Sequence, residues 1–122
     1  MPHLTIEYTK NVEQEFTFDD LFARLHQVLV DVAALPIGNC KSRARRLDDY
    51  YIADGGPQHA FLHLAIRFME GRSIELKRQI GRGCLEILEE FCCSPAGLEL
   101  QITVEIQDIE RTTYFKLPEG TL

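Results

Sequence analysis

The sequence predicts an α+β fold built from two β-α-β halves, with four strands in one sheet and two helices on one face of that sheet. Three observations lead to this prediction. The hydrophobic patterns follow the order strand, helix, strand, and the same order then repeats. The two halves are similar in length, and each alone would bury little apolar surface. A chain of 122 residues is also short enough to be one domain, so we expect residues 1–122 to fold together.

The first strand is predicted over residues 3–8, where Leu4, Ile6 and Tyr8 share one face and polar residues occupy the other. Thr17 then provides a side-chain oxygen that can cap a helix. The apolar positions of this helix recur with the helical period and are Leu21, Phe22, Leu25, Leu29, Val32 and Ala33.

Pro36 and Gly38 are expected to end this first helix. Residues 43–53 have a mixed pattern that predicts a second, weakly patterned strand, and the turn signal at 54–57 ends it. Residues 60–69 predict a third strand that is apolar on both faces, which suits a central place in the sheet.

Ser73 is expected to cap the second helix. The apolar stripe of that helix consists of Leu76, Ile80, Cys84, Ile87, Leu88 and Phe91. Pro95 and Gly97 close it, and residues 98–107 then alternate strictly between apolar and polar, which predicts the last strand.

Charge and composition exclude several classes of partner. The formal net charge of -6 disfavours binding to nucleic acid or to an anionic membrane surface. No stretch approaches the roughly 18 to 20 apolar residues of a membrane span, and a signal peptide is not recognisable, so a cytoplasmic protein is expected. The four cysteines are Cys40, Cys84, Cys92 and Cys93, and we interpret them as small buried hydrophobes.

Two further expectations concern assembly and metals. Several strands are predicted to carry apolar residues on the face that the helices leave uncovered, so a homo-oligomer is expected to cover it. His59 and His63 lie four residues apart, or roughly 13 Å along a strand, which is too far for one ion. No metal site is therefore expected.

Pro2 is the first candidate for chemistry. If Met1 is removed, which is expected before a small residue, Pro2 becomes a secondary amine and can act as a base. An apolar site would lower its pKa from the usual α-amino value of about 7.7 to 8.0 towards the working pH. The alternative is that Pro2 only favours removal of Met1 at a frayed terminus.

Four segments of the chain carry a family resemblance, and they are Pro2-His3-Leu4-Thr5-Ile6-Glu7, Asn39-Cys40-Lys41-Ser42-Arg43, Ala53-Asp54-Gly55 and Glu70-Gly71-Arg72-Ser73. Together they resemble the 5-carboxymethyl-2-hydroxymuconate isomerases of the tautomerase superfamily, and the similarity covers nearly the whole chain. The resemblance implies a tautomerase-like fold, an amino-terminal proline as catalytic base, a homotrimer and no cofactor. It also implies proton transfer on 5-carboxymethyl-2-hydroxymuconate, or on a close 2-hydroxymuconate or 2-oxo acid, in the degradation of aromatic acids.

The resemblance also assigns the cationic residues. It implies that Arg72 binds a carboxylate of the small-molecule substrate, as its rigid bidentate fork permits. Lys41 stands where relatives carry an arginine and keeps the charge without the fork, and Arg43 matches a family arginine. The alternatives are that Arg72 is a solvated loop residue and that the basic cluster 41–46 is a solvated strand edge, which we keep open above all for Arg45 and Arg46.

Two aromatic residues have lesser expected roles. His3 could adjust the environment of Pro2, although a histidine in a strand is commonly just packed, and Phe115 could form a pocket wall.

A rival interpretation of the whole chain is a non-catalytic oligomeric module that binds an acidic ligand or partner through residues 41–46. Retained Met1 without amine-dependent turnover would favour this rival.

Overall fold

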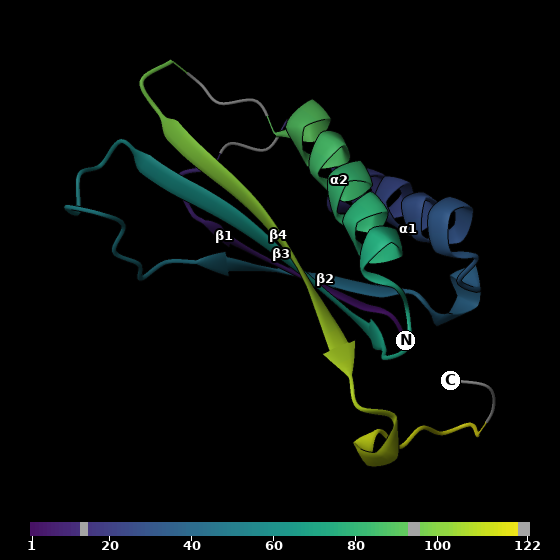
Figure 1. Ribbon diagram of the computed structural model, residues 1–122. Helices are drawn as coiled ribbons and strands as arrows, with labels where there is room; N and C mark the ends of the chain where they lie inside the picture. The colour runs from purple at the N-terminus through teal and green to yellow at the C-terminus, as the bar shows by residue number, and fades with distance from the viewer. Residues whose placement is uncertain (13–14, 93–95, 120–122) are drawn as a thin grey trace.

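The computed structural model describes residues 1–12, 15–92 and 96–119. Its main elements are, in chain order, β1 (His3–Thr9), α1 (Phe18–Ala33), β2 (Lys41–Leu47), β3 (His59–Met69), α2 (Ile74–Phe91) and β4 (Glu99–Ile109). Two short 3-10 turns, η1 (Ile37–Asn39) and η2 (Arg111–Thr113), follow α1 and β4. Both helices pack on the same face of one twisted sheet (Figure 1), so the predicted fold class is confirmed.

The sheet has the strand order β2-β1-β3-β4. β1 runs parallel to β2 and β3 runs parallel to β4, so each half is a β-α-β unit, and the halves meet through the antiparallel pair β1–β3. His3 consequently lies opposite both Lys41 and Arg67. The first residues of β1 and β2 and the last residues of β3 and β4 therefore share one end of the sheet, which we call the Pro2 end.

The core lies between the sheet and the helices. The fully buried side chains include Leu4 and Ile6 of β1, Leu64 and Ile66 of β3, and Leu25 and Ile80 of the two helices. Both predicted helix caps are confirmed, because the hydroxyl of Thr17 accepts from the Asp20 N–H and that of Ser73 accepts from the Leu76 N–H. Pro95 and Cys93, to which the sequence assigned a helix end and a buried thiol, lie outside the described residues.

The second strand differs from its prediction over 43–53. β2 begins at Lys41 and ends at Leu47. The reason is the length of its neighbour, because β2 is an edge strand that pairs only with β1, and the register runs out at the pair Thr9 and Leu47. Tyr51, which the prediction placed in the strand, is largely exposed in the following loop.

The open face of the sheet, opposite the helices, carries mostly polar side chains and a few apolar ones. Alternation along the strands puts Thr5 and Glu7 of β1 and Lys41, Arg43 and Arg45 of β2 on this face. Its side chains on β4 are Glu99, Gln101, Thr103, Glu105, Gln107 and Ile109. By the same alternation, its apolar side chains are Leu47 of β2, Phe61, Ala65 and Met69 of β3, and Ile109 of β4. Several strands therefore present apolar residues there, as predicted, although Met69 and Ile109 are already buried against Met1.

Within residues 1–12, 15–92 and 96–119, neither α1 nor α2 is apolar enough over sufficient length to cross a bilayer.

Cys84 is fully buried in the core, and burial raises the pKa of its thiol to about 12. It packs as an inert hydrophobe.

Candidate active site

The amino terminus is held inside the protein at the Pro2 end. Met1 is 3% exposed and Pro2 is buried. The amine of Met1 donates to the main-chain oxygen of Asn39 at 2.9 Å, and the carbonyl of Pro2 accepts from the backbone N–H of Lys41 at 3.1 Å. The terminus is therefore not frayed in this structure, in contrast to the alternative considered for Pro2.

A cavity of about 250 Å³ adjoins this terminus. Its walls come from the end of α1 and η1, from the end of β3 and from the loop after it, and its lining residues are Met1, Ala34, Leu35, Pro36, Asn39, Met69 and Arg72. The lining is mostly apolar, with one guanidinium. A small carboxylate with an apolar body matches that combination.

The surroundings of the Met1 amine lower its pKa. Burial and the neighbouring Lys41 reduce the pKa of the Met1 amine from 8.0 to about 6. The Lys41 ammonium donates to the same Asn39 oxygen at 2.9 Å, although Lys41 is not a lining residue. An amine in this position is mostly neutral near pH 7, and a neutral amine is a base.

Arg72 is placed by the short link between β3 and α2. Gly71 has φ 112°, a conformation that L side chains rarely adopt, and it turns the chain immediately before Arg72. The guanidinium donates to the main-chain oxygen of Met69 at 3.0 Å and lies 5.0 Å from the centre of the Phe68 ring. Only one of its five N–H groups is used in that bond, so the others can meet a substrate carboxylate.

Arg43 lies outside this cavity. As predicted from the alternation of an extended segment, it shares a face with Lys41. Its guanidinium contacts Nδ1 of His3 at 2.9 Å, and Nε2 of His3 lies 2.7 Å from the hydroxyl of Tyr114. The structure thus places Lys41 beside the terminus, Arg72 in the lining of the adjoining cavity, and Arg43 against His3.

The remaining cations of the basic cluster and Phe115 are peripheral. Arg45 lies on the open face, whereas Arg46 has the opposite parity and pairs with Asp48 at 3.6 Å. The cluster therefore does not form one continuous patch. Phe115 is 89% exposed and is not among the residues that line this cavity, so its role as a pocket wall stays a prediction.

Sequence reasoning missed two partners of the terminus. The main-chain oxygen of Asn39 leaves no signal in the sequence, because any residue offers a carbonyl. Tyr114 directly precedes Phe115, the residue of this region that the sequence analysis considered. The bond between His3 and Tyr114 spans 111 positions of the chain, so no local pattern could have revealed it.

The histidines of the second half lie elsewhere. His59 contacts Asp54 at 3.0 Å and Glu99 at 3.4 Å through opposite ring nitrogens, which ties the loop before β3 to β4. Among the described residues, no three histidine, cysteine or carboxylate side chains lie close enough to hold a metal ion.

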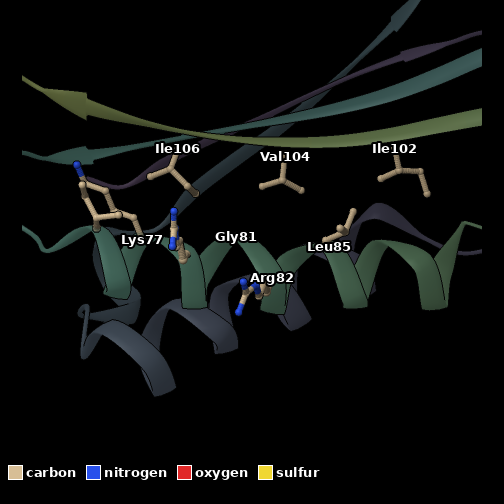
Figure 2. A pocket seen from close by; sticks show the side chains of 9 residues that line it. Lys77, Gly81, Arg82, Leu85, Ile102, Val104 and Ile106 are labelled. Carbon is tan, nitrogen blue, oxygen red and sulfur yellow. The ribbon is translucent and has the colours of Figure 1, made fainter.

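A second, larger hollow lies between α2 and the edge strand β4. It measures about 660 Å³ and is lined by Ile74, Lys77, Arg78, Gly81, Arg82, Leu85, Ile102, Val104 and Ile106. Figure 2 shows the three branched side chains of β4 pointing towards α2. The hollow contains none of the predicted site residues, so the cavity at the Pro2 end is the better candidate for the active site.

Comparison with known proteins identifies relatives over most of the chain. The family model of 5-carboxymethyl-2-hydroxymuconate isomerase matches residues 2–119. The 5-carboxymethyl-2-hydroxymuconate Delta-isomerase of Escherichia coli is 28% identical over 117 residues, which cover 95% of this chain and 93% of that protein.

Solved structures agree with this result. A 5-carboxymethyl-2-hydroxymuconate isomerase from Deinococcus radiodurans R1 superposes with a TM-score of 0.84 and 34% identity, covering 94% of this chain and 87% of that one. A fused 4-OT, described as a wild-type symmetric trimer, has the same fold with a TM-score of 0.74 and 15% identity, covering 98% and 94% of the two chains.

The paired β-α-β units, with a buried amine beside an arginine at one end of the sheet, define an isomerase of the tautomerase type. The chain belongs to the 5-carboxymethyl-2-hydroxymuconate isomerase family. It is therefore an enzyme, and the rival interpretation as a non-catalytic binding module is set aside.

Proposed function

We propose that this isomerase acts on 5-carboxymethyl-2-hydroxymuconate or a close 2-hydroxymuconate or 2-oxo acid, with the amine of Pro2 as general base. The observation that carries the proposal is the Met1 amine, one residue ahead of Pro2, whose pKa burial and Lys41 lower to about 6, beside the cavity that Arg72 lines. The family assignment supports the substrate class, and we assign the reaction to the degradation of aromatic acids, as the resemblance implies.

Removal of Met1 is part of the proposal. Here the Pro2 nitrogen is an amide, and the amine belongs to Met1, which itself lines the cavity. Loss of Met1 would move the amine back by one residue to Pro2, whose carbonyl is anchored to the start of β2. The same loss would enlarge the cavity by the volume of the methionine side chain, so one processing step would supply both the base and room for a substrate.

The proposed reaction is a transfer of one proton. The neutral Pro2 amine removes a proton from the carbon between the 2-oxo group and the double bond, and negative charge develops on the 2-oxygen. The protonated amine then returns the proton at the far end of the conjugated system, so the double bond moves into conjugation with the 2-oxo group. Arg72 and Lys41 hold the carboxylates and stabilise the developing charge in a site with little water.

The direct test is turnover by protein of known mass. Intact mass establishes whether Met1 is absent, and ultraviolet absorbance follows a panel of 2-hydroxymuconates, including the 5-carboxymethyl compound. Conversion to the conjugated 2-oxo acid by protein that begins at Pro2 is expected. If such protein leaves every member of the panel unchanged, the proposed reaction is wrong.

We also propose that the enzyme is a cytoplasmic homotrimer. β4 is an edge strand beside the hollow of Figure 2, and Phe115 and Leu117, which follow it, are 89% and 88% exposed. Apolar surface next to an unpaired strand edge favours contact with a second copy. The related fused 4-OT is a symmetric trimer. Light scattering is expected to give three times the chain mass, and a stable monomer at micromolar concentration would contradict this.

A further inference from the structure

Three side chains at the Pro2 end are connected by hydrogen bonds in a line, and none of the three lines the cavity. Arg43 of β2 contacts Nδ1 of His3, and Nε2 of His3 contacts the Tyr114 hydroxyl, at 2.9 and 2.7 Å. These residues come from three distant parts of the chain. The line ends beside the terminus, because Tyr114 packs against the buried cluster of Met1, Met69 and Ile109.

The chemistry of the two contacts fixes the direction of the hydrogen bonds. A guanidinium can only donate, so Nδ1 of His3 must accept from Arg43. The ring proton of neutral His3 is then on Nε2, where it is donated to the oxygen of Tyr114. The phenol oxygen is thus occupied as an acceptor, and its own O–H has to find a partner elsewhere. Within the described residues, no acceptor is hydrogen-bonded to it.

The charges around His3 keep this arrangement in place. Burial, followed by the cations Arg43, the terminal amine, Lys41 and Arg67, lowers the pKa of His3. His3 is therefore neutral at neutral pH. Protonation would give the ring a second N–H, at Nδ1. This N–H would face the Arg43 guanidinium, so the hydrogen bond from Arg43 to His3 would be lost.

Met1 and Met69 connect the surroundings of Tyr114 with the cavity. Tyr114 packs against the cluster of Met1, Met69 and Ile109, and Met1 and Met69 also line the cavity. The charge of Lys116, two residues beyond Tyr114, also reaches the terminal amine. Loss of Met1 would remove a side chain of this cluster and extend the cavity towards Tyr114.

We propose that Tyr114 donates a hydrogen bond to the anionic oxygen of the substrate, and that His3 and Arg43 are positioning residues that aim its O–H. This inference rests on the proposed function and adds a neutral donor to the cations of the site. The phenol keeps its proton throughout, so the amine of Pro2 still performs the only proton transfer. Arg43 then acts through His3, instead of binding the substrate itself.

A double-mutant cycle separates the two possible roles of Arg43. Tyr114→Phe is expected to lower kcat about 10- to 100-fold with KM changed by less than about twofold, because the lost bond forms with charge that develops in the transition state. Arg43→Ala should lower kcat by less, and in the Tyr114→Phe background it should cost nothing further. Arg45→Ala, which removes an exposed cation from the same face of β2, is the matched control and should change neither constant.

A second measurement reports on the line itself. Arg43→Ala removes a cation that lowers the pKa of His3, so the His3 resonance in an NMR titration should shift to a higher pKa, whereas Arg45→Ala should leave it in place. Independent, additive losses in kcat, a raised KM in Arg43→Ala alone, or full activity in Tyr114→Phe would each overturn the inference while leaving the base intact. A wild-type protein without turnover of any 2-hydroxymuconate would overturn the proposed function and this inference together.

Discussion

The amine of Met1 and the ammonium of Lys41 donate to one acceptor, the main-chain oxygen of Asn39, at 2.9 Å each. Two cations that share an acceptor disfavour each other's charge, and the weaker base loses its proton first. The terminal amine is the weaker base here, with its pKa lowered to about 6 by burial and then by Lys41. This relationship gives the first prediction.

Lys41→Ala should shift the acidic limb of the pH profile to higher pH. The reactive form is the neutral amine, so activity falls as pH drops through the pKa of the amine. Lys41 lowers the pKa of the Met1 amine both through a hydrogen bond and through its charge, and its backbone is bonded to Pro2, so its removal should also raise the pKa of the Pro2 amine. The measurement is kcat/KM against pH, which reports the free enzyme. Lys41→Arg keeps the charge and should hold the limb in place. A limb that stays still or moves to lower pH in Lys41→Ala would refute the coupling.

Arg72→Ala should lower kcat/KM about 10- to 100-fold, which corresponds to the loss of one charged hydrogen-bonding partner. Arg72 lines the cavity, whereas Arg45 lies exposed on the open face, so Arg45→Ala should have little effect. Steady-state kinetics on a dicarboxylate substrate and on an analogue that lacks one carboxylate would check the assignment. Equal losses in the two variants, or an Arg72→Ala loss that is the same for both substrates, would argue against a carboxylate contact.

Much of the fold could be predicted because its signals are local. The caps Thr17 and Ser73 and the alternation in β4 depend on neighbours within a few positions, and the structure confirms the caps. The end of β2 could not be predicted in this way. It depends on where β1 stops, a fact about a strand more than thirty positions earlier, and the mixed pattern of residues 43–53 carries no trace of it.

In the candidate site, too, local features could be predicted from the sequence and long-range contacts could not. Gly71 before Arg72 and the basic residues around Lys41 are local features, and the structure brings Arg72 and Lys41 to the terminus. The shared carbonyl of Asn39 and the partnership of His3 with Tyr114 arise only when distant strands meet at the Pro2 end. Sequence reasoning could therefore name charged residues but not their acceptors.

Lys41→Arg is expected to preserve or lower KM for a substrate with a carboxylate near Lys41. The guanidinium can bind a carboxylate through two parallel hydrogen bonds, whereas an ammonium acts as a point charge. Lys41 already donates to Asn39 from the start of β2, so a guanidinium at this position would act beside the same terminus. KM and kcat measured separately would show the change. If KM rises while the protein remains folded, Lys41 does not meet a carboxylate.

The sharpest prediction concerns Pro2, because only a free amine there can accept the proton. Insertion of a glutamine between Met1 and Pro2 should block removal of Met1, turn the Pro2 nitrogen into an amide without a basic lone pair, and abolish turnover. The fold should survive, because Met1 already packs at 3% exposure ahead of β1 without disturbing the pairing of His3 with Lys41 and Arg67. Pro2→Ala is the matched comparison, since a processed alanine terminus keeps a primary amine and should retain reduced activity with a shifted pH optimum. Intact mass confirms each terminus, and circular dichroism confirms that each variant is folded. Full turnover by a folded protein whose mass shows the insertion would exclude Pro2 as the base, because no free amine would then remain at that position.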